Sequence, residues 1–134
     1  MPTEGDGEVS GRDVARTWHG GQGVKGKNVD TSLPLGPWIV TKDEIPDPQT
    51  LRITSRLNGV TKQDSNTRRM VFSVARIIAE ISAGLTLHPG DVIITGTPEG
   101  VGMGRPPPEW MKLRDVIEAE IGKVGTLRNP IAQG

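Results

Sequence analysis

The sequence predicts an α+β fold that is dominated by β-strands and contains one main helix. Apolar and polar residues alternate in residues 51–57 and again in residues 115–121, which is the period of a strand with one buried face. Asn58-Gly59 follows the first of these segments and is typical of a hairpin turn. Residues 70–81 alone repeat apolar side chains at helical spacing. At 134 residues, the chain has the length of one domain but is short for a complete enzyme with its own cleft.

The chain divides by composition into two parts. Residues 1–33 are rich in Gly, Asp, Thr and Lys and show little apolar periodicity, so they are predicted to be loop or disorder. Residues 34–134 are expected to form the core of the domain. Within that core, residues 37–41 (PWIVT) are predicted to be a strand, and residues 43–48 (DEIPDP) a turn-rich connection that cannot continue a sheet.

The next two elements are a hairpin and the main helix. Residues 51–57 and 60–64 are the predicted hairpin strands. Residues 65–67 offer Ser, Asn or Thr as the N-cap of the helix, and Gly84 offers its end. Arg68 and Arg69 would then lie in the first turn, where the helix dipole opposes a positive charge. Either an anion or acidic neighbour compensates for them, or they are simply solvated.

Residues 89–105 (PGDVIITGTPEGVGMGR) are the first candidate for a functional site. The β-branched run 92–94 predicts a short strand that is buried on both faces. Thr95, Thr97 and Glu99 follow at its carboxyl end, among glycines that let a ligand approach the backbone closely. The chain then ends with the exposed antiparallel strand predicted for residues 115–121 and a short extended segment over residues 125–130.

Composition argues against several classes of partner. Sixteen acidic and sixteen basic side chains cancel, so the net charge does not indicate binding to nucleic acid or to an anionic membrane. No apolar run approaches the roughly 20 residues of a membrane span. Cysteine is absent, which excludes disulfides and thiolate metal sites and is compatible with a reducing cytoplasm, where we expect the protein.

Other common sites are also poorly matched. The glycines of residues 100–104 are followed by prolines instead of the helix that a dinucleotide needs behind its pyrophosphate. His19 and His88 stand in unrelated contexts, which disfavours zinc, and His88 is most simply a turn residue. No serine lies in the Gly-x-Ser-x-Gly pattern of a nucleophile elbow.

Several motifs in one order resemble the C-terminal core of the fumarylacetoacetate hydrolase family, over roughly residues 8 to 131. They are LGPWIVT (35–41), Asn58-Gly59, QDSNT (63–67), FSVARIIAEIS (72–82), GDVIITGTPEGVG (90–102) and GTLRNP (125–130). The resemblance implies the β-roll of that family, here without its upstream part. It also implies metal-dependent cleavage, decarboxylation or isomerisation of 2,4-dioxo acids (acylpyruvates) and 2-hydroxydienoates, which are small keto-acid substrates.

The resemblance further implies a divalent cation, Mg²⁺ or else Mn²⁺ or Ca²⁺, held by carboxylates from three segments. Two of these carboxylates form a Glu-x-Glu pair upstream of anything present in this sequence. Glu8 matches the third, although the family has aspartate there, and Ala15 replaces a usual glutamine nearby. Lys27 and Thr31, in GKNVDT (26–31), match a lysine and a threonine that line the metal and substrate site.

The remaining site residues are also implied by the family motifs. Lys27 is the candidate catalytic residue, because a lysine stabilises a developing enolate where water is excluded. Thr97, with Gly96 beside it, matches the threonine that contacts the substrate carboxylate, and Arg105 is a candidate for a distal carboxylate. The alternatives are a solvated surface lysine at Lys27 and a turn threonine at Thr97.

Two hypotheses follow for function. The first is an enzyme of the family, or part of one, that breaks a C–C bond through an enolate. Hydrolysis also needs a general base to activate water, which in the family is an upstream His-Glu pair that neither His19 nor His88 matches. An isomerase or decarboxylase is the variant of this hypothesis. The second is a non-catalytic truncated module that pairs through its sheet. A homodimer is expected in either case, because an isolated half-core leaves apolar surface to be covered.

Overall fold

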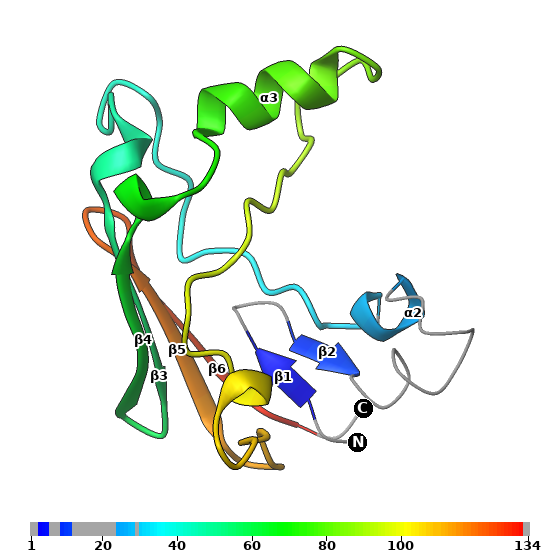
Figure 1. Ribbon diagram of the computed structural model, residues 1–134, viewed down its shortest axis with the longest axis vertical. Coiled ribbons are helices and arrows are strands. Elements are labelled where there is room, and N and C mark those ends of the chain that lie inside the picture. The colour runs from blue at the N-terminus through cyan, green and yellow to red at the C-terminus, as the bar shows by residue number, and fades with distance from the viewer. Residues whose placement is uncertain (1–2, 6–8, 12–23, 29, 133–134) are drawn as a thin grey trace.

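A four-stranded antiparallel sheet and one main helix organise the chain, as the sequence predicts (Figure 1). The computed structural model describes residues 3–5, 9–11, 24–28 and 30–132. The strand order in the sheet is β4-β3-β5-β6. The bounds of these strands are Arg52–Leu57 for β3, Val60–Asn66 for β4, Val116–Ile121 for β5 and Gly125–Pro130 for β6.

The hairpin β3–β4 forms where the sequence predicts it. Asn58 and Gly59 adopt φ angles of 53° and 79°, which is the left-handed pair that a type I′ turn requires. The register shifts by one residue between Ser55 and Arg56, so β4 is one residue longer than β3. This irregularity places Ser55 opposite Gln63, a pair that becomes important at the functional site.

The other side of β3 pairs with β5, which also follows the predicted alternation. Leu57 lies opposite Ile117, and both side chains are buried with Met111 in a small core, against which Ile131 packs. Farther along the same face, Ala119 and Ile121 of β5 are turned toward the hollow described below. The core therefore lies at one end of the sheet, and a hollow lies at the other.

Helix α3 spans Val74–Ser82, so it begins later than the sequence predicts. Asn66 does accept the hydrogen bond of a cap, but from the 3-10 turn η3 (Thr67–Arg69), and Ser73 caps α3 separately. Gln49 stabilises the break, because its amide accepts from Val74 N at 2.7 Å and donates to Thr67 O at 3.1 Å. The predicted end is confirmed: Gly84 N donates to Ile81 O just beyond the helix.

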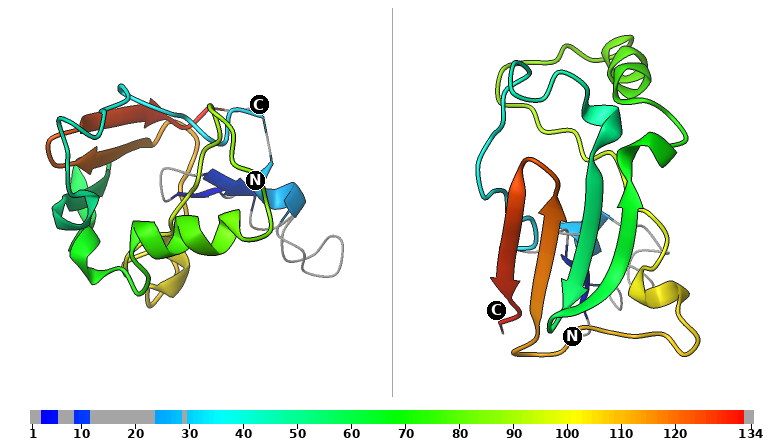
Figure 2. Two further views of the ribbon diagram at one scale, coloured as in Figure 1. Left: turned by 90° about the horizontal axis from the view of Figure 1, so that it is seen from above. Right: turned by 90° about the vertical axis from the view of Figure 1, so that its left-hand side faces the viewer.

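Residues 85–101, called the crossing segment here, run from α3 across one face of the sheet (Figures 1 and 2). The prediction of a strand buried on both faces at residues 92–94 is wrong, because this segment forms no ladder and Val92 and Ile94 are 59% and 55% exposed. Such a strand needs partners at both edges, and no described strand lies beside it.

The strand predicted for residues 37–41 is also absent, and Ile39 is 93% exposed. The turn-rich character of residues 43–48 is confirmed by a turn over residues 42–44 and by the 3-10 turn η2 (Pro48–Thr50). Apolar β-branched residues in both failed strands have the right composition for burial, but only Val40 and Ile93 among them are half-buried, and Ile39, Val92 and Ile94 are exposed.

Part of the segment predicted to be loop carries short elements. Strands β1 (Thr3–Gly5) and β2 (Val9–Gly11) pair antiparallel, and α2 covers Val24–Lys27. In the views of Figures 1 and 2, α2 lies at the end of the molecule remote from β4. None of the described helices has the length and apolarity needed to cross a membrane.

Candidate active site

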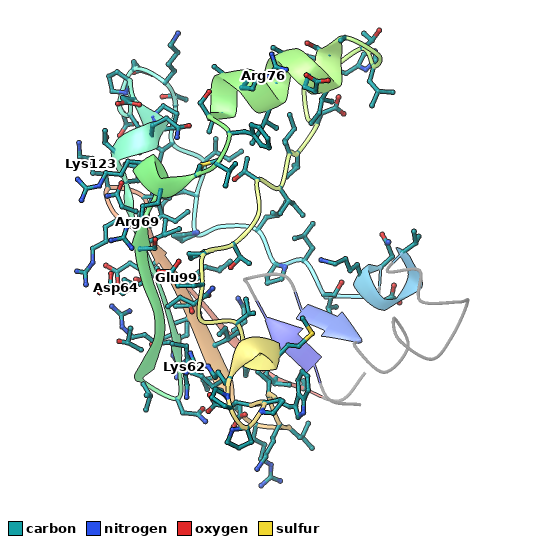
Figure 3. The ribbon with its side chains drawn as sticks, viewed as in Figure 1. Lys62, Asp64, Arg69, Arg76, Glu99 and Lys123 are labelled. Atoms are coloured by element: carbon teal, nitrogen blue, oxygen red, sulfur yellow. The ribbon has the colours of Figure 1, made fainter. Side chains whose placement is uncertain are left out.

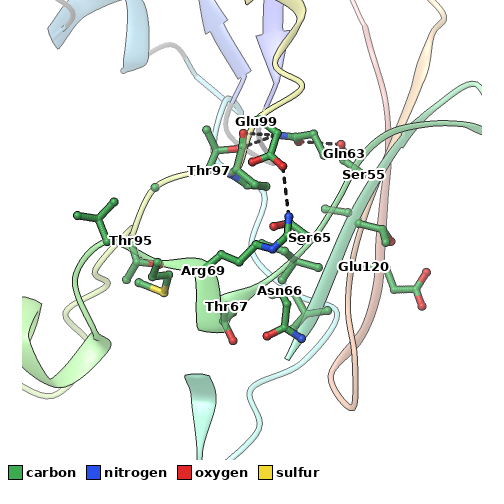
Figure 4. A pocket seen from close by; sticks show the side chains of 18 of the residues that line it. Ser55, Gln63, Ser65, Asn66, Thr67, Arg69, Thr95, Thr97, Glu99 and Glu120 are labelled. Carbon is green, nitrogen blue, oxygen red and sulfur yellow. Dashed lines mark hydrogen bonds and ion pairs between the residues drawn. The ribbon is translucent and has the colours of Figure 1, made fainter. Parts of the chain in front are cut away.

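A hollow of about 550 Å³ lies between the sheet and the crossing segment (Figure 4). Strands β3, β4 and β5 form its floor, residues 95–99 form one wall, and η3 with residues 70–72 forms the other. Its polar and charged lining residues are Thr54, Ser55, Gln63, Ser65, Asn66, Thr67, Arg69, Thr95, Thr97, Glu99 and Glu120.

A chain of short hydrogen bonds ties the floor to the wall. Ser55 Oγ donates to Gln63 Oε1 at 2.7 Å across the β3–β4 pair. Gln63 Nε2 donates to Thr97 Oγ1 at 2.8 Å and to the backbone oxygen of Pro98 at 3.0 Å. Ser55 and Gln63 are each only 6% exposed, whereas Thr97 is exposed, so the network leads from the protein interior to the wall of the hollow. The predicted residues Thr97 and Gly96 therefore do line the hollow.

One ion pair crosses the rim of the hollow (Figures 3 and 4). Arg69 Nη1 from η3 lies 3.5 Å from Glu99 Oε1 of the crossing segment. The side chains are 64% and 79% exposed, so solvent screens the pair. Arg69 is the one basic residue among the described residues that line the hollow. For the arginines before the helix, the sequence left open an acidic neighbour or solvation alone. Arg69 has the acidic neighbour, Glu99.

Three glycines in and after the wall of the hollow differ in how closely other atoms approach them. Gly96 has a φ of +94° and open space where a Cβ would stand. Gly100 has a φ of +103°, and a Cβ there would come within 2.5 Å of the backbone oxygen of Lys62. A Cβ on Gly102 would overlap the backbone oxygen of Glu109. The last two glycines are thus required by close packing of the chain against itself.

Arg105 fastens this loop to the sheet. Its Nη2 donates to the backbone oxygens of Lys62 and Gly100, at 2.7 and 2.8 Å. Its Nε lies 3.5 Å from a carboxylate oxygen of Glu109, which also pairs with Lys62 Nζ at 2.6 Å. Arg105 is not among the residues that line the hollow. Its predicted role at a distal carboxylate stays a prediction.

Two further predicted site residues, Lys27 and Thr31, lie away from the hollow. Lys27 ends α2 and is exposed, and its backbone oxygen accepts from Ser32 Oγ at 3.3 Å. Thr31 is exposed and has a φ of 63°. Neither residue lines the hollow, and Glu8 lies outside the described residues. The catalytic role of Lys27 and the metal-binding roles of these three residues remain predictions.

The described residues also do not supply a complete set of ligands for a divalent ion. Within residues 3–5, 9–11, 24–28 and 30–132, no three His, Cys, Asp or Glu residues gather as metal ligands. Of the two carboxylates that line the hollow, Glu99 pairs with Arg69, and Glu120 accepts from Arg56 at 2.6 Å. His88 is a turn residue, as expected, because its N–H donates to Asp91 Oδ2 at 2.7 Å.

Gln63 lines the hollow although no role was predicted for it from the sequence, whereas Glu99 lies in the predicted candidate stretch 89–105. Gln63 belongs to the QDSNT motif, and Glu99 follows Thr97-Pro98. Alternation along β4 could have indicated that Gln63 faces the same side as Ser65, because residues two apart share a face of a strand. Its contact with Thr97 joins two distant parts of the chain, and no local signal marks such a contact.

Comparison with known proteins identifies a family for most of the chain. Residues 7–132 match the family described as Fumarylacetoacetate (FAA) hydrolase C-terminal. The mitochondrial oxaloacetate tautomerase of Xenopus laevis is 48% identical over 124 residues, which are 92% of this chain and 39% of that protein. The sequence similarity thus extends over nearly all of the chain.

Solved structures give the same result for the fold. Fumarylacetoacetate hydrolase from Exiguobacterium antarcticum superposes with a TM-score of 0.89 at 39% identity, over 95% of this chain and 45% of that chain. Maleylpyruvate hydrolase from Sphingobium sp. SYK-6, in complex with manganese(II) ion and pyruvate, gives a TM-score of 0.75 at 41% identity, over 83% and 39% of the two chains. The predicted fold, including its likeness to this family, is confirmed.

The match also shows what share of a relative the chain represents. It spans 39 to 45% of the length of these relatives. The family match, the sequence identity and the fold each extend over most of the chain. The chain belongs to the fumarylacetoacetate hydrolase family and corresponds to its C-terminal domain.

Proposed function

We propose that the chain is an enzyme, or part of one, that acts on a small keto acid such as a 2,4-dioxo acid or a 2-hydroxydienoate. The proposed reaction breaks a C–C bond beside a carbonyl group through an enolate. Isomerisation, tautomerisation or decarboxylation of the same substrate class is the variant, because each of these reactions passes through a similar enolate or enol. We also propose that the reaction requires a divalent metal ion, Mg²⁺ or Mn²⁺, since a solved relative contains manganese(II) ion and pyruvate.

One observation carries the proposal: a hydroxyl and a guanidinium line the same hollow. Thr97 Oγ1 lies on one wall and Arg69 on the other, and both are suited to bind anionic oxygens (Figure 4). The volume of about 550 Å³ is in the range of small-molecule sites. Two anion-binding groups in one hollow favour a substrate with two negatively charged ends, such as a dicarboxylic keto acid.

The residues of the hollow have distinct tasks in this proposal. Thr97 donates its hydroxyl hydrogen to a carboxylate or to the oxygen on which enolate charge develops, and a donor held in place there lowers the barrier. Arg69 binds the second carboxylate after leaving Glu99, because both charged groups are exposed and their pairing is weak. Met70 and Phe72 line the hollow beside Arg69 and give it an apolar surface for the carbon skeleton of the substrate.

The proposal is tested by turnover of oxaloacetate and acetylpyruvate, with and without Mg²⁺ or Mn²⁺, followed by ultraviolet absorbance of the enol. In Arg69→Gln we expect KM for oxaloacetate to rise about tenfold, because a hydrogen bond to a charged group contributes roughly 1.5 kcal/mol or more. Arg76→Gln is the matched control: Arg76 pairs with Glu80 on α3, away from the hollow (Figure 3). Absence of both turnover and keto-acid binding at any metal concentration would rule the proposal out.

A second candidate function is a module that pairs with another copy of itself. Large apolar side chains are unusually exposed for so small a domain, among them Ile39 at 93% and Val71 at 90%. A symmetric homodimer would cover such surface on both copies. Sedimentation of the purified chain tests this candidate, with Val71→Asp expected to yield a monomer. A chain that is monomeric at high micromolar concentration would exclude it.

A cytoplasmic location is proposed on the composition alone. The absence of cysteine suits a reducing compartment, whereas the relative from Xenopus laevis is named as mitochondrial. Fractionation of source cells with an antibody against the chain distinguishes the two compartments.

A further inference from the structure

The side-chain amide of Gln63 has an orientation that its surroundings determine. One of its terminal atoms lies 3.0 Å from the backbone oxygen of Pro98. A carbonyl oxygen only accepts hydrogen bonds, so the atom that faces it must be the nitrogen. With the amide reversed, two acceptor oxygens would face each other at that distance without a hydrogen between them. The Pro98 carbonyl therefore fixes Nε2 toward the crossing segment.

The second hydrogen of Nε2 then determines the role of Thr97. Gln63 Nε2 lies 2.8 Å from Thr97 Oγ1 and has no acceptor capacity, so the threonine oxygen accepts this bond. A hydroxyl carries one hydrogen, which must point elsewhere. In the part of the chain that the structure describes, Thr97 Oγ1 donates to no recorded acceptor. Because Thr97 lines the hollow, that hydrogen is available to a ligand there.

The far side of the amide is fixed as well. Ser55 Oγ donates to Gln63 Oε1 at 2.7 Å, and the two residues are paired in the β3–β4 register. Both are 6% exposed, so water competes little for these bonds. Three connected hydrogen bonds thus make Thr97 Oγ1 the acceptor of the bond from Gln63. Their donors and acceptors cannot all be reversed, because the Pro98 carbonyl can only accept. The sheet holds Ser55 and Gln63 in place.

We propose that Gln63 is a positioning residue that holds the Thr97 hydroxyl as a hydrogen-bond donor toward anionic oxygen in the hollow. The ligand class that this arrangement selects is a carboxylate or enolate, because such oxygens accept hydrogen bonds and bring none of their own. The inference rests on the proposed function, and it identifies the residue that orients the threonine for it. Gln63 itself need not touch the ligand.

A double-mutant cycle tests the proposal, with pyruvate as the probe in the presence of Mn²⁺ and its affinity measured by calorimetry on the full chain. Thr97→Val removes the hydroxyl and is expected to weaken binding about tenfold or more, the loss of one hydrogen bond to a charged group. Thr97→Ser keeps the hydroxyl and should restore most of the affinity. In Gln63→Glu, the carboxylate accepts the Thr97 hydrogen, so the hydroxyl no longer donates into the hollow and a similar loss is expected.

The decisive value is the effect of Gln63→Glu in the Thr97→Val background. If Gln63 acts through the hydroxyl, the second substitution changes pyruvate affinity by less than about twofold, because coupled residues are not additive. A residue that merely anchors the crossing segment through Pro98 would weaken binding equally in both backgrounds, and that result overturns the proposal. If Gln63→Glu fails to fold, Ser55→Ala serves instead: it frees Oε1 and is expected to weaken binding severalfold, again only when Thr97 is present.

The outcomes separate this inference from the proposed function. Binding of pyruvate by the wild-type chain that falls in Thr97→Val but not in Gln63→Glu or Ser55→Ala overturns the role of Gln63 and leaves the proposed function intact. Binding that survives Thr97→Val overturns the inference by removing its target. If the wild-type chain neither binds pyruvate nor turns over oxaloacetate, the proposed function fails and this inference fails with it.

Discussion

Arg69 and Glu99 face each other across the rim of the hollow, with 3.5 Å between Nη1 and Oε1. The arginine comes from η3 and the glutamate from the crossing segment, so the pair joins two parts of the chain that are otherwise separate walls. An exposed pair of this kind contributes roughly 0 to 1 kcal/mol and weakens with salt. A ligand carboxylate therefore competes with Glu99 for the same guanidinium.

Glu99→Gln is expected to raise the affinity for a dicarboxylic keto acid by up to about fivefold, because it removes that competitor at a cost of no more than about 1 kcal/mol. Affinity for pyruvate, which has one carboxylate, should change little. Titration of oxaloacetate and pyruvate at low and high salt measures both effects. Glu80→Gln, which breaks the pair with Arg76 on α3, is the charge-matched control. Equal effects of Glu99→Gln on the two ligands would contradict the assignment of Arg69 to the second carboxylate.

Gly100→Ala is expected to destabilise the protein by about 1 to 3 kcal/mol, the usual cost of a strained backbone position. Its φ of +103° suits glycine, and a Cβ would come within 2.5 Å of the Lys62 backbone oxygen. Urea unfolding followed by tryptophan fluorescence measures the change. Gly84→Ala is the control, since a Cβ there meets nothing within 4 Å, and its effect should stay within about 0.5 kcal/mol. Equal stability of the two variants would show that the loop can relax around the added carbon.

Ser73→Ala should lower the stability of α3 by about 0.5 to 2 kcal/mol, because Ser73 Oγ accepts from Arg76 N at 3.2 Å as the N-cap. Ser73→Asp should recover most of the loss, since aspartate is an equally good cap. Ser82→Ala at the other end removes only an exposed bond to Ala79 O and is expected to be nearly neutral. Circular dichroism during urea unfolding compares the three variants. A loss in Ser82→Ala as large as in Ser73→Ala would argue against capping as the cause.

Asp115 should make stability depend on pH at the acidic end. Its pKa is lowered, first by the hydrogen bond from Asn58 Nδ2 at 2.9 Å and then by the backbone N–H of Lys112 at 2.7 Å. A carboxylate whose pKa is depressed on folding stabilises the protein above the unfolded value, near 3.9, and loses this contribution as pH falls through the folded value.

Asp115→Ala is therefore expected to be less stable than wild type at pH 7, with a gap that narrows steadily below about pH 4. Urea midpoints at pH 7, 5, 4 and 3 follow the gap. Glu44→Ala, in the exposed turn at residues 42–44, controls for the change in net charge. A gap for Asp115→Ala that stays constant down to pH 3 would mean that its charged form is not favoured by folding.

Local signals in the sequence were sufficient for the hairpin and for the end of the helix. Asn58-Gly59 specifies its turn through two left-handed residues, and α3 ends at Ser82, just before the predicted stop at Gly84. The helix start was less predictable, because Gln49, distant in sequence, holds the break before Val74. Wherever a distant side chain completes the local structure, the local pattern gives the wrong boundary.

The two strands that failed have a related explanation. Residues 37–41 and 92–94 have the composition of buried strands, but a strand also needs edges to pair with. The described sheet ends at β4 and β6, and neither segment pairs with those edges. For the site, Thr97 and Gly96 were predicted from a family motif, whereas Gln63 and Arg69 acquire their roles only through contacts with the crossing segment.

The position of β3 between β4 and β5 has a consequence for how the chain folds. Strand β3 pairs with β4 through a two-residue turn. Its pairing with β5 requires closure of the long loop formed by residues 67–115. Closing that long loop costs entropy before its contacts repay it, so the local hairpin forms early and the long-range pairing late. Gln63 is therefore in place on the hairpin before Thr97 arrives, and the chemistry of the hollow is acquired only in the slowest step of folding.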